Sequence, residues 1–181
     1  MQSIDLSGLT MCFGNVALAA GSTTTLTSTG TPAYCVNGKP AAVTSVTNVQ
    51  PFATDANTGS AVKTIPPGYG CVFVVGVNAT FSTTYQWVQG EIVPLRPADS
   101  ATDYSAAKDW ISGYPEFPVL PDGFCPVGYI VAKVASTQAV TSPLNMFTNL
   151  TTATGAQNSN TTAYAITYTS VCTLPNRPVA V

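Results

Sequence analysis

The sequence contains no histidine, and Asp, Glu, Lys and Arg together make up only 8% of its 181 residues. A typical soluble domain is about one quarter charged, and histidine is the usual acid–base group and metal ligand near neutral pH. Without histidine, neither a Ser-His-Asp triad nor a Cys-His pair can form, so a nucleophile would need a lysine or a carboxylate as its base. The composition therefore predicts a protein that is not an enzyme, with no catalytic residues and no bound cofactor or metal.

Acidic residues between positions 99 and 122 are the remaining candidates for catalysis or cation binding. Paired carboxylates support glycoside hydrolysis, and several carboxyl oxygens together can hold a hard cation. However, Asp99 and Asp103 fit the first turn of a helix, where the helix dipole favours negative charge. Asp122 lies in Pro-Asp-Gly, an ordinary turn sequence. These residues therefore predict local structure rather than a reactive site.

The few charged residues are spread along the chain. Six basic and eight acidic residues give a net charge of −2, and neither sign forms a block. A nucleic-acid-binding surface needs clustered lysines and arginines to neutralise phosphates, so the sequence argues against nucleic acid as a partner. Weak repulsion between copies of such a chain favours self-association.

Long apolar runs are also missing. No segment reaches the roughly 18 apolar residues that a membrane helix needs, so we expect no membrane partner. The apolar run Val16–Ala20 is short, and the residues before it include Asp5 but no lysine or arginine. The positive region of a signal peptide is therefore absent, and we expect no export signal in this sequence.

Five cysteines are present, and none of them belongs to a Cys-x-x-Cys pair, which argues against a zinc site. An odd number in a chain of this length is not typical of a disulfide framework. Most have apolar neighbours, which predicts small buried side chains with free thiols. One or two disulfides are the alternative if the protein matures in an oxidising compartment. The cysteines are Cys12, Cys35, Cys71, Cys125 and Cys172.

Short β-branched and aromatic runs separated by Gly, Pro and Asn turns dominate the sequence. This pattern predicts an all-β fold, a β-sandwich or barrel-like domain with one short helix and extended arms. The clearest strand is 71–77, which is apolar on both faces, as in a central strand. Its expected partner is 85–93, and two further strands are expected at 128–134 and 162–171.

Turn signals divide the first part of the chain. Asn37-Gly38 predicts a two-residue hairpin turn, because both residues tolerate the positive φ angles of a type I′ turn. Pro40 lacks a backbone N–H, so the returning strand should lie at a sheet edge. Residues 1–30 are rich in Thr and Ser and weakly patterned, which predicts an N-terminal arm or an edge strand. Residues 31–181 are expected to form a single β-rich domain.

One stretch, from the capping residue Ser100 to Gly113, predicts a short helix. The proline-rich residues 114–123 that follow should run as stiff extended chain, because proline fixes φ and removes a donor. Three aromatic side chains lie in or beside these segments: Trp110, Tyr114 and Phe117.

These aromatic residues have more than one interpretation. Aromatic side chains on a stiff backbone suit a protein interface, and Trp87 joins the three as an interface candidate. Alternatively, they cover the open end of the domain's own sandwich. A further alternative is a carbohydrate-binding or hydrolytic sandwich that uses Trp87, Trp110 and the carboxylates.

Several segments carry a resemblance to a known group of proteins. In sequence order, the segments are Val36–Lys39, Thr54–Gly59, Gly70–Val74, Val88–Gly90, Phe117–Pro126 and Thr173–Pro178. From about Asn37 onward, this series resembles small virion structural proteins of tailed bacteriophages. The segments mark strands and turns rather than a reactive site.

The resemblance implies a β-rich protein on the phage head, either a capsid decoration (cement) subunit or a contributor to head fibres. It implies the major capsid protein as the partner, the capsid surface as the location, and assembly in the host cytoplasm. Closed symmetry is usual for oligomers, and the threefold positions of an icosahedral shell make a homotrimer the expected state. A head-fibre, tail or baseplate subunit that contacts the host surface is the structural alternative.

Overall fold

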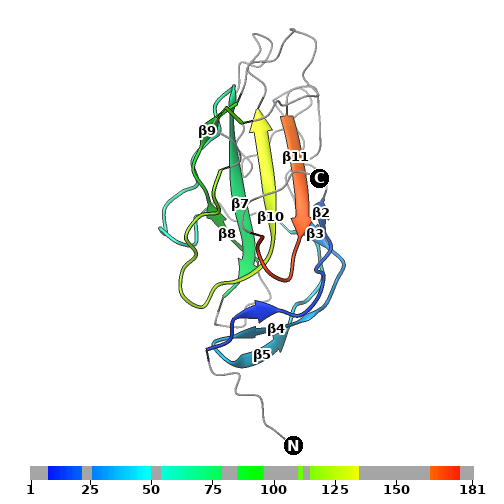
Figure 1. The fold of residues 1–181 in the computed structure, drawn as a ribbon. Coiled ribbons are helices and arrows are strands. Elements are labelled where there is room, and N and C mark those ends of the chain that lie inside the picture. Colours follow the sequence, from blue (N-terminus) through cyan, green and yellow to red (C-terminus); the bar gives the residue numbers. More distant parts are fainter. Residues whose placement is uncertain are drawn as a thin grey trace, which may run out of the picture.

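The computed structural model describes residues 8–21, 26–49, 54–78, 85–95, 110–111, 115–134 and 164–175. Within these ranges the chain forms three antiparallel sheets and no helix (Figure 1), which confirms the predicted all-β class. The strands are β1 (Met11–Cys12), β2 (Leu18–Ala20), β3 (Leu26–Ser28), β4 (Ala33–Val36), β5 (Lys39–Ala42), β6 (Val46–Val49), β7 (Tyr69–Val77), β8 (Gln86–Gln89), β9 (Val93–Pro94), β10 (Cys125–Val134) and β11 (Tyr164–Ser170).

The largest sheet has the strand order β11-β10-β7-β8, and β9 also pairs with β7. The expected central strand is confirmed, because β7 lies between β10 and β8 and its residues 70–77 are all buried. The expected partner at 85–93 is present but divided. β8 and β9 pair with different parts of β7, and residues 90–92 between them belong to neither strand.

A β-bulge in β10 keeps both halves of that strand facing the main core. The register of β10 on β7 shifts between Pro126 and Gly128, so Val127 is an extra residue. Side chains alternate along a strand, so without this residue the two halves of β10 would present opposite faces. With it, Cys125 and Ile130 both belong to the main hydrophobic cluster.

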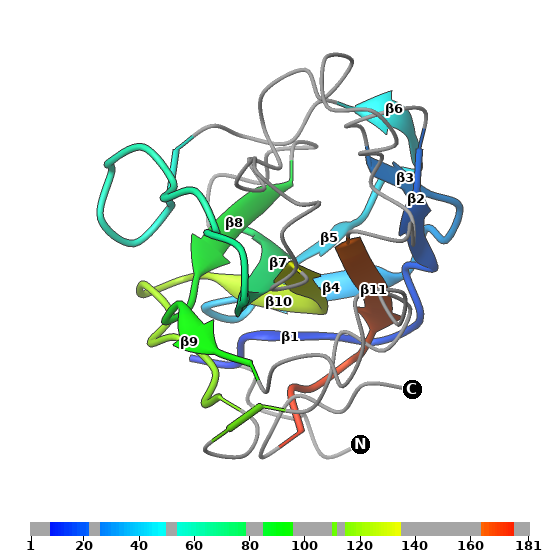
Figure 2. The same cartoon turned by 90° about the horizontal axis from the view of Figure 1, so that it is seen from above.

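Two small sheets, β1-β4-β5 and β2-β3-β6, are built from residues 8–49. The first crosses the lower end of the large sheet in Figure 1, and β2 of the second lies beside β11 (Figure 2). The predicted hairpin between β4 and β5 is confirmed, with φ of 48° at Asn37 and 79° at Gly38. Pro40 lies on an edge strand, as expected, because β5 is the outer strand of its sheet.

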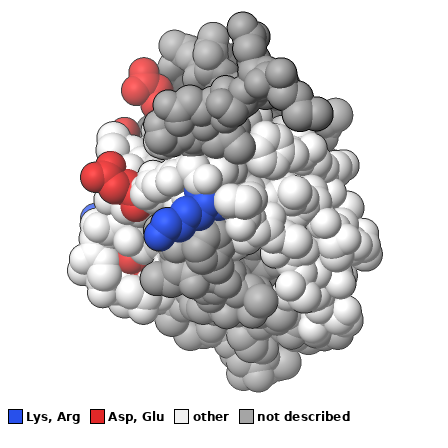
Figure 3. All heavy atoms as spheres, turned by 90° about the horizontal axis from the view of Figure 1, so that it is seen from below, with Lys and Arg blue, Asp and Glu red and all other residues white. Residues whose placement is uncertain are grey.

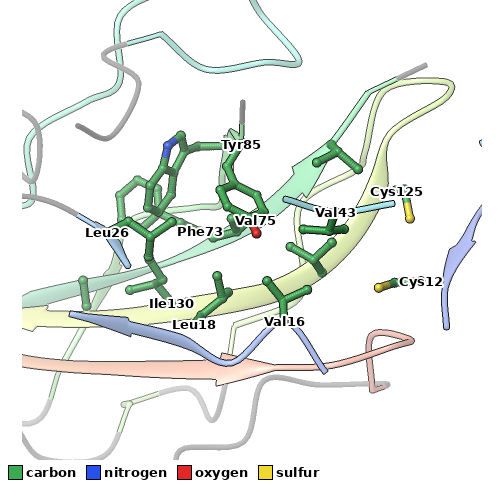
Figure 4. Packing of buried hydrophobic residues seen from close by; sticks show 14 of the residues in the cluster. Cys12, Val16, Leu18, Leu26, Val43, Phe73, Val75, Tyr85, Cys125 and Ile130 are labelled. Carbon is green, nitrogen blue, oxygen red and sulfur yellow. The ribbon is translucent and has the colours of Figure 1, made fainter. Parts of the chain in front are cut away.

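The described residues before Gly30 do not form a free arm. They supply Cys12, Val16, Leu18 and Leu26 to the main cluster, and each of these side chains is at most 7% exposed. Figure 4 shows these side chains together with those of the large sheet in one continuous core. The alternative prediction for residues 1–30, an edge strand, agrees with β1 and β2, each of which is the outer strand of its sheet. β3, in contrast, is the central strand of its sheet.

Both faces of the large sheet are covered. Its inner face packs against the two small sheets. Its outer face carries Val72, Val74 and Tyr129, and chain segments 115–124 and 171–175 pack across them. A sheet covered on both sides requires apolar residues at consecutive positions, which is the pattern seen in β7.

The predicted helix from Ser100 to Gly113 falls mostly outside the described residues. Its last part is described and is not helical, because Trp110 forms a β-bridge with Leu95 and Ile111 lies in a turn. The helix prediction is therefore wrong for Trp110 and Ile111. The Ile111 N–H donates to the carbonyl of Pro94 at 3.3 Å, so this short piece of chain follows the end of β9 instead.

Candidate functional site

Trp87 lies in the core rather than at the surface. Its side chain is 1% exposed and meets Phe73 edge-on, with the ring centroids 6.3 Å apart. Trp87 pairs with Val75 across β8 and β7, so it points into the main cluster. A side chain that its own chain encloses cannot contact a partner or a sugar, so this structure does not support Trp87 as an interface or carbohydrate-stacking residue.

Trp110 is also enclosed by its own chain, at 3% exposed. Its indole ring lies against Gly70, where an added Cβ would collide with the ring. The ammonium group of Lys133, which pairs with Gly70 across β10 and β7, lies over the Trp110 ring at 5.2 Å from its centroid, a cation–π contact. Trp110 therefore covers the outer face of the large sheet. It is buried by its own chain, as the alternative to an interface role expected, but it covers a sheet face rather than the open end of the sandwich.

Phe117 follows the same pattern in part. It is half-buried and packs edge-on against Tyr129, with the ring centroids 5.1 Å apart. Residues 115–120 form neither helix nor strand, as the prolines predict, and Val119 is 81% exposed. Tyr114, the remaining interface candidate, lies outside the described residues.

The two small sheets present an almost uncharged surface. Lys39 is the single charged residue between positions 8 and 49. Phe13 is 51% exposed there, and Thr44 and Ser45 are also exposed. Figure 3 looks at the end of the molecule where β4 and β5 lie, and it shows an uncharged area to the right of a basic side chain in the middle of the view. We use the name uncharged face for the exposed residues of 8–21 and 26–49, among which Lys39 carries the single charge.

A loop of residues 54–63 covers the outer edge of β8. The Ala56 N–H donates to the carbonyl of Trp87 at 2.7 Å, and the Gln89 N–H donates to the carboxylate of Asp55 at 2.6 Å. These two groups of β8 would otherwise be available to a further strand. The loop therefore protects this edge against pairing with another chain.

Asp55 organises this loop from a buried position, since its side chain is only 5% exposed. Its Oδ1 accepts hydrogen bonds from the N–H of Asn57 at 3.1 Å, the N–H of Thr58 at 2.8 Å and the hydroxyl of Thr58 at 3.0 Å. Its Oδ2 accepts the Gln89 N–H described above. Both oxygens are engaged with donors of the chain, so Asp55 acts as a structural anchor rather than as a base.

A pocket of about 340 Å³ lies between this loop and β8. The side-chain amide of Gln89 bridges it, accepting from the Lys63 N–H at 2.7 Å and donating to the Lys63 carbonyl at 2.8 Å. The lining offers hydroxyl and amide groups but no pairing of a nucleophile with a base. The lining residues are Asp55, Asn57, Thr58, Ser60, Ala61, Lys63, Gln89 and Gly90.

All five cysteines are described, and all have free thiols. The prediction of burial is confirmed for four of them, and Cys172 is exposed. Among the described residues, His, Cys, Asp and Glu form no group of three or more that could hold a metal ion. The described part of the chain also contains no helix long and apolar enough to cross a membrane.

Sequence reasoning missed the uncharged face, although its signal was present. Between Asp5 and Asp55 the sequence contains one charged residue, Lys39. If this segment folds, so little charge indicates an unusual surface. The anchoring role of Asp55 was also missed, because its partner Gln89 lies 34 positions away in the sequence. Comparisons with protein-family models, with curated proteins and with solved structures find no match to this chain.

Proposed function

We propose that this chain is a virion structural protein of a tailed bacteriophage, namely a capsid decoration (cement) protein that binds and stabilises the shell of the major capsid protein. The observation that carries the proposal is the uncharged face. Soluble proteins usually intersperse charges over their surface, and charged residues are depleted at the core of protein interfaces. A surface with one lysine among residues 8–49 is suited to burial against a protein partner.

The resemblance of the segments from Asn37 onward to small phage virion proteins supports the same function. The work is mechanical and includes no catalytic step. A subunit that binds the assembled shell but not its dissociated parts stabilises the shell by mass action. A stable contact of this kind buries roughly 1,200–2,000 Å² in total.

The proposed oligomer is a homotrimer, which matches the threefold positions of an icosahedral shell. Pairing of β5 with a strand of another subunit is disfavoured as a trimer contact, because this edge strand carries Lys39 and Pro40. Trp110 is also excluded from the contact by its burial. We therefore expect trimer contacts through side chains, and light scattering of the purified protein tests the trimer directly, since a stable monomer would contradict it.

The decisive experiment adds the purified protein to heads that were assembled without it from the major capsid protein of the same phage. Co-sedimentation then measures decoration. Thr44→Glu places a carboxylate on the uncharged face, and Thr64→Glu places one on an exposed threonine elsewhere. Burying an unpaired charge costs several kcal/mol, so we expect Thr44→Glu to bind at least about tenfold more weakly, with Thr64→Glu unchanged.

Three results would contradict parts of this proposal. Failure of the unaltered protein to bind heads would remove the decoration function. Equal binding by the two glutamate variants would remove the uncharged face as the contact surface. Antibody labelling of complete particles at the tail or at head fibres would favour the alternative of a host-contacting subunit.

A further inference from the structure

The turn between β4 and β5 contains a chemically labile dipeptide, Asn37-Gly38. It is the single Asn-Gly in the sequence, and asparagine is among the thermolabile residues of proteins. Glycine has no side chain to shield its backbone nitrogen, so this nitrogen can attack the side-chain amide carbon of the asparagine before it. Asn37 is exposed, so water can reach it.

The fold holds both residues in a conformation that prevents this attack. Asn37 has a φ of 48° and Gly38 a φ of 79°, as a type I′ turn requires. In the left-handed region ψ is about +30° to +60°, which places the nitrogen of the next residue on the opposite side of the Cα–C bond from Cβ. Ring closure needs this nitrogen and Cβ on the same side, so the turn must open before the two atoms can meet.

The residues just before β1 hold the turn in this conformation. The Gly38 N–H donates to the carbonyl of Leu9 at 3.0 Å, so the attacking nitrogen is already engaged. The hydroxyl of Thr10 donates to the side-chain Oδ1 of Asn37 at 3.3 Å and accepts the Asn37 N–H at 3.1 Å. Both reacting groups are therefore held by the same piece of chain. We call Leu9 and Thr10 the strap.

The contacts of the strap are of a kind that opens locally. Leu9 and Thr10 lie outside any strand and are only half-buried. The hydrogen bonds between Thr10 and Asn37 are exposed, so water can replace them. Exposed contacts at the end of a regular element open without unfolding of the core. Opening of the strap alone would thus free the turn.

We propose that Asn37 is a site of spontaneous deamidation that the strap suppresses in the folded protein. When the strap opens, hydroxide removes the proton of the Gly38 nitrogen, and this nitrogen attacks the side-chain carbonyl carbon of Asn37. The new C–N bond closes a succinimide ring, and the side-chain nitrogen takes a proton from water and leaves as ammonia. Water then opens the ring at either carbonyl and gives aspartate or isoaspartate. In total one water is consumed and one ammonia is released, without oxidation or reduction.

The isoaspartate product would weaken the hairpin. Its main chain contains an additional methylene group, which a two-residue turn cannot accommodate while Val36 stays paired with Lys39. β4 also supplies Tyr34 and Val36 to the main core, so the damage would extend to the packing. Either product adds a carboxylate to the uncharged face. The inference does not depend on the proposed function, because it concerns the isolated protein.

The test incubates the purified protein in mildly alkaline buffer, folded and in urea, and follows deamidation at Asn37 by peptide mapping and mass spectrometry. We expect the folded protein to react at least about tenfold more slowly, because only its opened fraction reacts. Thr10→Val removes the hydroxyl but keeps the shape of the side chain, so it should raise the folded rate at least about threefold. Thr10→Ser keeps the hydroxyl and is the matched control, with an unchanged folded rate.

The rates in urea separate an effect of the fold from an effect of the sequence. Thr10 lies 27 positions from Asn37, so its variants should all react equally fast when unfolded. Asn37→Gly keeps a sequence that a type I′ turn accepts, and it should remove the modified peptide. The isoaspartate form of the unaltered protein should melt at a Tm lower by roughly 2–4 °C.

Three outcomes would overturn the proposal. Equal rates in the folded protein and in urea would show that the fold gives Asn37 no protection. Equal folded rates for Thr10→Val and the unaltered protein would remove the role of the strap. The absence of deamidation at Asn37 in urea would remove the site itself.

Discussion

The hydroxyl groups of Ser28 and Tyr85 lie 2.9 Å apart inside the main core and share a hydrogen bond. Ser28 Oγ also accepts the N–H of Val46 at 3.3 Å. Both side chains are 1% exposed, so a lost partner could not be replaced easily by water. This contact joins the small sheet β2-β3-β6 to the residue that enters β8.

Removing either hydroxyl should destabilise the fold, but by different amounts. Tyr85→Phe loses one buried hydrogen bond, which is worth about 1 kcal/mol of unfolding free energy. Ser28→Ala leaves both the tyrosine hydroxyl and the Val46 N–H without this hydrogen-bond partner, so we expect a larger loss of about 1–3 kcal/mol. Urea unfolding of the single and double variants measures the coupling, and strict additivity would show that the two hydroxyls do not interact.

Ala17→Gly should stabilise the protein. Ala17 has a φ of 52°, in the left-handed region that costs a residue with a Cβ roughly 1 kcal/mol but costs glycine little. The Ala17 N–H is held by the side chain of Asn15 at 2.6 Å, which keeps this turn in place. We expect the unfolding free energy to rise by about 0.5–1 kcal/mol in urea titration.

The control for this prediction is Ala19→Gly, in strand β2, where glycine loses more conformational freedom on folding than alanine does. It should lower the unfolding free energy. A destabilised Ala17→Gly variant would show that Cβ contacts of Ala17 outweigh the backbone strain.

Asp55→Ala should release the loop of residues 54–63. The carboxylate accepts four hydrogen bonds, so its loss should lower the unfolding free energy by about 2–3 kcal/mol and increase proteolysis within the loop. Asp122→Ala removes an exposed carboxylate from another turn and should change stability by less than about 0.5 kcal/mol. Equal stability of the two variants would contradict the anchoring role of Asp55.

Stability should be nearly independent of pH from about 6 to 8 and should fall above pH 9. No histidine titrates in the lower range. Burial raises the pKa of Cys71 and of Cys125 from 9.0 to about 12. Between these values the thiols ionise in the unfolded chain but stay protonated in the folded one, so the unfolded chain binds fewer protons and unfolding becomes more favourable.

Urea unfolding midpoints under reducing conditions, measured from pH 7 to 11, test this expectation. Cys71→Ala should reduce the decline above pH 9, because one of the two thiols whose pKa burial raises to about 12 is gone. Cys172→Ser is the matched control, since Cys172 is exposed, and it should leave the decline unchanged. A constant midpoint up to pH 11 would contradict the inferred burial of the thiols.

The sequence by itself determined the all-β class, the Asn37-Gly38 hairpin and the central strand at 71–77. Each depends on a local property that any fold must respect. Asn and Gly permit positive φ, and an uninterrupted apolar run needs cover on both faces. The proline-rich residues 115–120 belong with these, because each proline fixes φ and lacks the N–H that a helix or an inner strand needs.

Only the tertiary structure decided where the weakly patterned and aromatic residues lie. The Thr-rich beginning of the chain shows little periodicity, and its strands are held by distant partners, as in the bond from the Leu18 N–H to Ser170, 152 positions away. The sequence alone is compatible with Trp87 and Trp110 facing either a partner or the core of their own chain. They are buried because the large sheet has two apolar faces. When the chain covers both faces with its own residues, the apolar surfaces of the sheet and of the two tryptophans are removed from water.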